Sequence, residues 1–288
     1  MTMSSKEFVQ HIAEYIEPLY QSSEEQTQAY FRNDPDLDEA IFHFKRRMFN
    51  ERMNIVEIGK NLINKKASTD PTTLKLLSKQ VYDEAKHYDM VRNVIEYLSG
   101  HKFTETELEE EYKFQMDKDN IAEKGASLFD EIGGQDSELM AATYQFVAEG
   151  RAARVWSAMA TSIDDPIVSK TYAKISKDEH MHSRIGARTI EQLATTPEAQ
   201  KEIMDVLPQM MERMFWINCQ GTAAVKAGAD RCTEQYGFDT SDEMMESKGK
   251  VWQQIKDSTH NWKPLARGVF GEDTDLASEL KLNNFSFA

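Results

Sequence analysis

Cysteine, glycine and proline are all scarce in this chain. Only two of its 288 residues are cysteines, Cys219 and Cys232. Two cysteines are too few for a disulfide scaffold and favour a reducing compartment, so we expect a cytoplasmic protein. The sequence also has only 13 glycines and 7 prolines but 15 methionines, a composition that suits long helices packed against one another.

Long apolar runs and a basic surplus are also lacking. No apolar run of about 20 residues is present and the mean hydropathy is −0.63, so we expect no transmembrane helix. The first ten residues, MTMSSKEFVQ, show no basic region followed by an apolar stretch and predict no signal peptide. Lys and Arg total 34 against 49 Asp and Glu, a net charge of −15. This balance argues against a nucleic-acid partner and against docking on an anionic membrane.

Helical periodicity is what the sequence has instead, along almost its whole length. No alternating strand pattern and no Asn-Gly or Asp-Gly hairpin signal is visible. The long periodic segments cover about 38–64, 71–98, 137–160 and 166–193. We therefore expect an all-α protein that forms a single helical domain over 1–288.

Other segments flank the long helices. We expect an N-terminal helix over 4–21, followed by a polar stretch over 24–34, and an acidic, solvated helix over 104–124. Met-rich helices over about 198–236 would either cover the core or form a homodimer contact. A C-terminal tail over about 237–288 completes the chain.

An internal repeat is the most informative feature. Asp70-Pro71 and Asp165-Pro166 are both typical N-cap and first-turn pairs, and each opens a long helix. In both helices an Asp-Glu-x-x-His signature follows, with its Glu fourteen residues after the cap. The two copies are Asp83-Glu84-x-x-His87 and Asp178-Glu179-x-x-His182. Because another long helix precedes each signature helix, we predict a four-helix bundle with its core at about 38–195.

The signature itself points to metal binding. Glu and His three residues apart lie on one face of a helix, and here that face also carries Val91 and Ile95 in one copy and Ile175 and Ile190 in the other. A buried carboxylate is costly unless it is compensated, so such a stripe implies a cation. Carboxylate and imidazole together suit Fe or Mn. The full signature is expected only about 0.05 times by chance, which makes two copies a strong signal.

Two further carboxylates, one from each remaining long helix, would complete a two-metal site. Glu149 shares an apolar stripe with Phe146 on the third long helix. On the first long helix, Glu51 shares a core face with Met48, whereas the alternative, Glu57, lies on a largely wet face. The expected ligands are Glu51, Glu84, His87, Glu149, Glu179 and His182, with Glu57 as the alternative to Glu51.

Asp83 and Asp178 stand directly before the signature glutamates. Carboxylates in such positions commonly accept the second imidazole N–H of a metal-binding histidine and fix its orientation. We expect this role for both residues, with a solvent-facing acid as the alternative. His180 does not share the face of the signature and is not an expected ligand.

These residues resemble the ferritin-like superfamily of di-iron oxidases and oxygenases, over about 38–195. The superfamily includes bacterial multicomponent monooxygenases, acyl carrier protein desaturases, the phenylacetyl-CoA epoxidase catalytic subunit, aldehyde-deformylating oxygenases and the small subunit of ribonucleotide reductase. The Asp-Glu-x-x-His form is nearer the monooxygenase, epoxidase and desaturase branches. The resemblance implies two Fe ions, or a Mn/Fe pair, with O2 as co-substrate and an external electron donor.

The chain also departs from these families. Many monooxygenases have a Thr one turn after the third-helix Glu, where this chain has Ala152 and Ala153. Ribonucleotide reductase small subunits have a radical Tyr four residues after the first His, where this chain has Val91. These differences argue against a proton relay through that hydroxyl and against a radical-generating role.

We therefore expect an O2-dependent di-iron enzyme that hydroxylates, desaturates or otherwise oxygenates a small, mainly apolar organic substrate. We expect its pocket to be lined by Phe146, Ala153, Trp156, Gly186 and Met residues. The alternatives are a ferritin- or rubrerythrin-like metal-handling protein, the radical-generating subunit of a reductase, and a structural helical protein without metal.

Overall fold

The computed structural model shows an all-helical protein, which confirms the predicted fold class. The structure describes residues 3–32, 35, 37–64, 70–116, 128–134 and 137–223. Within these ranges no strand is present, and no helix is long and apolar enough to cross a membrane. The predicted C-terminal tail, and the part of the Met-rich segment after residue 223, lie outside the described residues.

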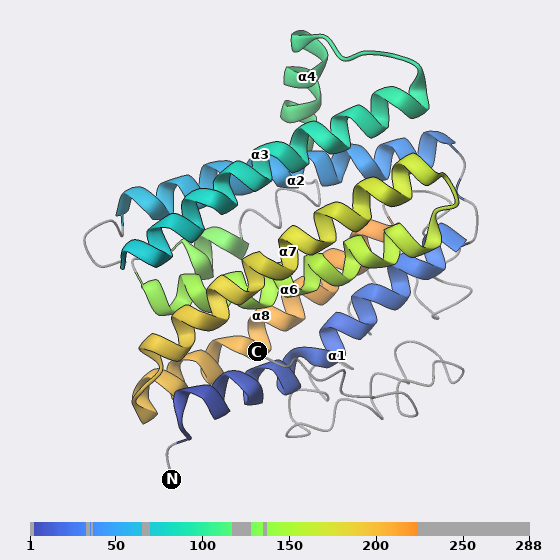
Figure 1. Ribbon diagram of the computed structural model, residues 1–288. Coiled ribbons are helices and arrows are strands. Elements are labelled where there is room, and N and C mark those ends of the chain that lie inside the picture. Colours follow the sequence, from blue (N-terminus) through green and yellow to red (C-terminus); the bar gives the residue numbers. More distant parts are fainter. Residues whose placement is uncertain are drawn as a thin grey trace.

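The helices follow one another closely along the chain (Figure 1). They are α1 (Ser5–Arg32), α2 (Leu37–Asn64), α3 (Pro71–Ser99), α4 (Glu105–Gln115), the π-helical turn η1 (Phe129–Gly133), α6 (Glu138–Ser162), α7 (Pro166–Leu193) and α8 (Pro197–Ala223).

Four of these helices form the predicted bundle. Helix α2 packs along α3, and α6 packs along α7, so each half of the internal repeat is one helix pair. Contacts between α3 and α7, the two signature helices, join the two pairs. The four helices thus enclose the middle of each signature between them.

The predicted caps open both signature helices. The Asp70 carboxylate accepts two backbone N–H groups of the first turn of α3, at 2.7 and 3.0 Å. The Asp165 carboxylate does the same for α7, at 2.9 and 3.0 Å. Pro71 and Pro166 follow at the first helical positions, where no N–H is needed. These caps place both signatures at the same depth along their helices.

Glycine allows α6 and α7 to lie unusually close together. A Cβ atom at Gly186 would stand 2.6 Å from the Phe146 backbone nitrogen and 2.7 Å from the Ala142 carbonyl oxygen. Ser183 and Ser176, on the same side of α7, donate hydrogen bonds to the carbonyls of Phe146 and Ala153, at 2.9 and 3.0 Å. This close contact sets the distance between the acidic residues that the two helices carry.

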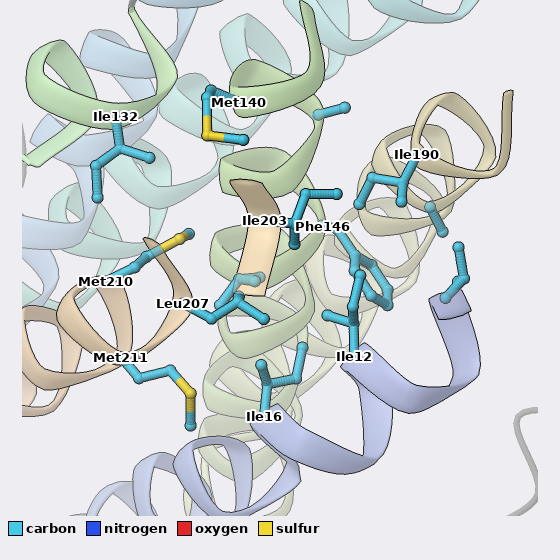
Figure 2. Packing of buried hydrophobic residues seen from close by; sticks show 14 of the residues in the cluster. Ile12, Ile16, Ile132, Met140, Phe146, Ile190, Ile203, Leu207, Met210 and Met211 are labelled. Carbon is cyan, nitrogen blue, oxygen red and sulfur yellow. The ribbon is translucent and has the colours of Figure 1, made fainter. Parts of the chain in front are cut away.

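Helices α1 and α8 cover the bundle on the side of α6 (Figure 1). Figure 2 shows Ile12 and Ile16 of α1 against Leu207 and Met211 of α8, with Phe146 of α6 beside them. The Met-rich helix therefore covers the core in its described part, which is one of the two roles expected for it.

Two predicted boundaries differ from the structure. Helix α1 continues through the polar stretch 24–34 as far as Arg32, because Tyr30 and Phe31 in that stretch are buried against α2. The acidic helix is α4, which begins with a capping box of Thr104 and Glu107 and ends at Gln115. The rest of its predicted span, from residue 117, lies outside the described residues.

Candidate metal centre

The six predicted ligands meet inside the bundle. Helix α2 contributes one carboxylate, α6 another, and α3 and α7 each contribute a Glu and a His. All six are buried: Glu51, Glu84, His87, Glu149, Glu179 and His182. They form two overlapping groups of four, in each of which one ligand atom per residue lies within 4.8 Å of the others. Glu84 and Glu179 belong to both groups, so the arrangement has two adjacent positions for a cation.

The histidines define the two positions. His87 Nδ1 lies 3.2 Å from Glu51 Oε2 and 3.1 Å from Glu179 Oε1. His182 Nδ1 lies 3.1 Å from Glu84 Oε1 and 3.0 Å from Glu179 Oε2. The two oxygens of Glu179 therefore face different histidines, whose ring centroids are 5.9 Å apart. One carboxylate can thus serve both positions.

The structure brings Glu51 into the centre and leaves Glu57 outside it. Glu51 is buried beside His87, whereas Glu57 accepts a hydrogen bond from Lys60 at 2.8 Å and belongs to neither group. Six residues of helix separate the two side chains by about 120° around the axis, so Glu51 lies against His87 while Glu57 lines a neighbouring cavity. His180 is exposed and also belongs to neither group.

Asp83 and Asp178 lie against the outer nitrogens of the imidazoles, as predicted, but their partners cross between the helices. His87 Nε2 lies 3.2 Å from Asp178 Oδ2, and His182 Nε2 lies 3.4 Å from Asp83 Oδ2. Each aspartate therefore orients the histidine of the other signature helix. Lys86 Nζ links the pair, donating to Asp83 at 3.2 Å and to Asp178 at 2.5 Å.

Three amide side chains that the sequence analysis missed complete the surroundings. Gln80 Nε2 donates to Glu149 Oε1 at 2.6 Å, and Gln145 Nε2 in turn donates to Gln80 Oε1. Asn54 Nδ2, which lines the same cavity as the two glutamines, donates to Glu84 Oε2 at 3.2 Å. Gln80 stands one turn before Glu84 on the same stripe, and this spacing is the signal that could have identified it.

Burial and mutual charge shift the ionisation of the cluster. Burial raises the pKa of Glu51 to about 8 and the pKa of Glu149 well above its usual range. Burial alone would lower the pKa of the imidazoles, but hydrogen bonds and charges from the surrounding carboxylates raise that of His87 to about 11 and that of His182 to about 12. Without metal, protons must therefore balance the acidic groups.

The donor set fits two divalent cations. Four carboxylates carry four negative charges, which two divalent ions balance while both imidazoles stay neutral. Each imidazole directs Nδ1 into the centre and Nε2 toward an aspartate, so the tautomer needed for metal binding is the one that the aspartates favour. Mixed carboxylate and imidazole ligands suit Fe and Mn.

A cavity of about 300 Å³ leads to this centre along the bundle. It begins between the first turn of α3, at Asp70 and Thr73, and the end of α7, at Leu193, and η1 contributes Phe129 to its wall. Glu149 also lines it. Among the described lining residues the charged side chains are all carboxylates.

The expected lining of the pocket is wrong. Phe146 and Trp156 are packed in the two hydrophobic clusters, Ala153 is fully buried, and Gly186 lies against the backbone of α6. These residues fill the contacts between helices instead of facing open space. The cavity is lined by residues nearer the start of α6 and the end of α7, and no described methionine is among them.

Comparisons with family models, with curated proteins and with solved structures find no match to this chain. The assignment of the centre therefore depends on the residues and their geometry.

Proposed function

We propose that this chain is a di-iron oxidoreductase that uses dioxygen to oxidise a small organic molecule, in the manner of the ferritin-like enzymes that its motifs resemble. The observation that carries the proposal is the buried pair of four-residue groups with Glu84 and Glu179 in common. Iron would supply the electron transfer and oxygen activation that side chains cannot supply.

Glu51 and His87 would hold one metal ion, and Glu149 and His182 the other, with Glu84 and Glu179 between them. Fe is the first choice and Mn/Fe the alternative, because carboxylate oxygens and imidazole nitrogens suit both metals. The remaining residues act on these ligands. Asp83 and Asp178 orient the imidazoles, and Gln80 holds the Glu149 carboxylate at 2.6 Å.

The cavity supports an enzyme over a metal-storage protein. A storage site needs no room for an organic molecule, whereas this centre has a cavity of about 300 Å³ against Glu149, near the lower end for a small-molecule site. Most of its wall is apolar, and amide groups lie at its inner end, including Gln80 and Gln145. This suits a small, largely apolar molecule with a polar group.

The radical-generating alternative lacks support at the residue where it would be expected. Val91 is fully buried among apolar side chains, and the nearby Tyr172 stacks on Trp156 with ring centroids 5.1 Å apart. An external electron donor, a cytoplasmic location and a homodimer remain predictions of the sequence.

The test is oxygen consumption by the iron-loaded protein in the presence of a reductant and a panel of small organic molecules. We expect substrate-dependent oxygen uptake and an oxidised product. Ala141→Phe, which fills the cavity, should retain both irons but lose the response to substrate. Ala173→Phe, on the exposed face of α7, is the matched control and should behave like the wild type. Iron-loaded protein that never consumes oxygen would rule out the proposal.

A further inference from the structure

A second buried charge cluster, of opposite sign, lies on α2 just before Glu51. Arg46 and Arg47 are only 6% and 8% exposed. Arg46 Nη1 and Arg47 Nε are buried without a hydrogen-bond partner, and no carboxylate among the described residues forms an ion pair with either guanidinium. Such burial is unusual because an arginine side chain has only donors and a permanent charge.

The surroundings of these arginines add to the positive charge. Burial first, and then the charge of Arg151 on α6, lowers the pKa of Arg46 to about 10. Burial, Arg46 and Arg151 together hold the pKa of Arg47 well below its usual range. Burial and both arginines also lower the pKa of His43, whose Nδ1 lacks a partner. Cationic groups of α2 and α6 thus act on Arg46 and Arg47 in addition to burial.

Aromatic side chains surround the cluster and exclude water from it. The Arg47 guanidinium lies 5.9 Å from the ring centroid of Trp156, and His43 stacks on Tyr30 at 5.4 Å. Tyr172 stacks on the same Trp156 ring, with centroids 5.1 Å apart, and its hydroxyl is buried without a hydrogen-bond partner. Donors are thus abundant here, while the acceptor that would satisfy them is missing among the described residues.

The charge of Glu51 acts favourably on Arg47, but Glu51 also lies beside His87 in the candidate metal centre. Two bound cations would neutralise the charge of Glu51. The positive charges of Arg46 and Arg47 would then lack a counter-ion. An isolated buried charge is so costly that a counter-ion is expected. The planar guanidinium fork matches the two oxygens of a phosphate or carboxylate group.

We propose that Arg46 and Arg47, with the Tyr172 hydroxyl, bind a small oxyanion, either a phosphate or a carboxylate group, beside the metal centre. This site goes beyond the proposed enzymatic function, since it needs no iron and no dioxygen. The anion compensates the arginines in the same way that metal cations compensate the buried carboxylates.

The experiment is thermal unfolding of the full-length protein at matched metal content and constant ionic strength. Sodium chloride is replaced in steps by inorganic phosphate or by acetate, and the two series distinguish a phosphate site from a carboxylate site. We expect one series to raise the melting temperature in a saturable way, by roughly 5 °C at one hundred times Kd. Titration calorimetry of the wild type with the same anion should give a matching Kd.

Arg46→Met and Arg47→Met should each abolish this response. In chloride alone, both variants should melt at or above the wild-type temperature, because each removes a charge that no anion compensates. Arg52→Met is the matched control on α2, since Arg52 lies over the Tyr112 ring at 4.0 Å, and it should keep the full response. If neither anion binds the wild type, or if the two variants respond like it, the site does not exist. Neither result would affect the metal centre, which is measured by iron content.

Discussion

Glu179 is the residue on which the two candidate metal positions depend most. Its oxygens lie 3.1 and 3.0 Å from the two histidines, and both neighbouring imidazolium charges hold the pKa of its carboxyl well below the usual range despite complete burial. Glu51 has only one histidine beside it, and burial raises its pKa to about 8. The two carboxylates therefore differ in ionisation because they differ in the number of cationic neighbours.

Exchanging Glu51 or Glu57 tests the choice of ligand on α2. Glu51→Ala should lower the iron content from two per chain to about one or less, because it removes a buried carboxylate of the group that contains His87. Glu57→Ala should keep both irons, since Glu57 contacts Lys60 and not the centre. Elemental analysis after anaerobic Fe(II) loading measures the iron content of both variants. The reverse pattern would assign the ligand role to Glu57.

The crossed aspartates give a second prediction. Asp178→Asn should weaken metal binding roughly 10- to 100-fold, because the amide no longer accepts the imidazole N–H of His87 as a charged partner does. The fold should persist, since Asp178 is partly exposed. Competition with a metal chelator measures the affinity. Asp164→Asn, in the exposed turn before α7, is the control, and an equal loss there would point to a general charge effect.

The residues of the centre were predictable where an apolar stripe carried an acid or a histidine. Glu84, His87, Glu149, Glu179 and His182 were found in this way, and the apolar stripe also favoured Glu51 over Glu57. Gln80 and Gln145 were missed because an uncharged amide on such a stripe gives no sign that it will meet a carboxylate. Arg46 and Arg47 were missed because adjacent arginines on a helix usually lie in solvent.

At the scale of helices, the contact between α6 and α7 sets the geometry of the centre. Glu149 and Glu179 come from these two helices, and their separation depends on how closely the helices approach at Gly186. Gly59 in α2 is different, since a Cβ atom there would meet nothing within 4 Å. The two glycines allow a matched comparison of a packed and an unpacked position.

Gly186→Ala should destabilise the protein by about 1–3 kcal/mol and lower its iron affinity, because the added methyl group forces α6 and α7 apart. Gly59→Ala should be neutral or stabilise by about 0.5–1 kcal/mol, since alanine favours the helix and meets no obstacle. Urea unfolding and iron titration check both variants. A Gly186→Ala protein with wild-type stability would show that the close contact is not required.

The sequence predicted the long helices well because their caps are local signals. Asp70-Pro71 and Asp165-Pro166 act within one turn, and both caps form as expected. The end of α1 could not be predicted in the same way. Its polar last part stays helical because Phe31 stacks on Phe44 of α2, with ring centroids 5.8 Å apart, and this contact joins two different helices.

Across the whole molecule, charged side chains of both signs lie in the interior as well as on the surface. The net charge is −15, yet the bundle buries carboxylates at the metal centre and arginines one turn of α2 away. Buried charges of either sign are costly, and under the two proposals above a counter-ion from solution compensates each cluster. Helices α1 and α8 cover the α6 side of the bundle, and the cavity leads from its end toward Glu149.

The central claim is that this interior binds two metal ions. The most direct measurement is anaerobic titration of the full-length protein with Fe(II), followed by elemental analysis and Mössbauer spectroscopy. We predict two irons per chain in a coupled pair, and loss of the pair in Glu179→Ala, which removes the carboxylate common to both positions. A wild type that binds no iron, or a Glu179→Ala variant that still binds a coupled pair, would contradict the account.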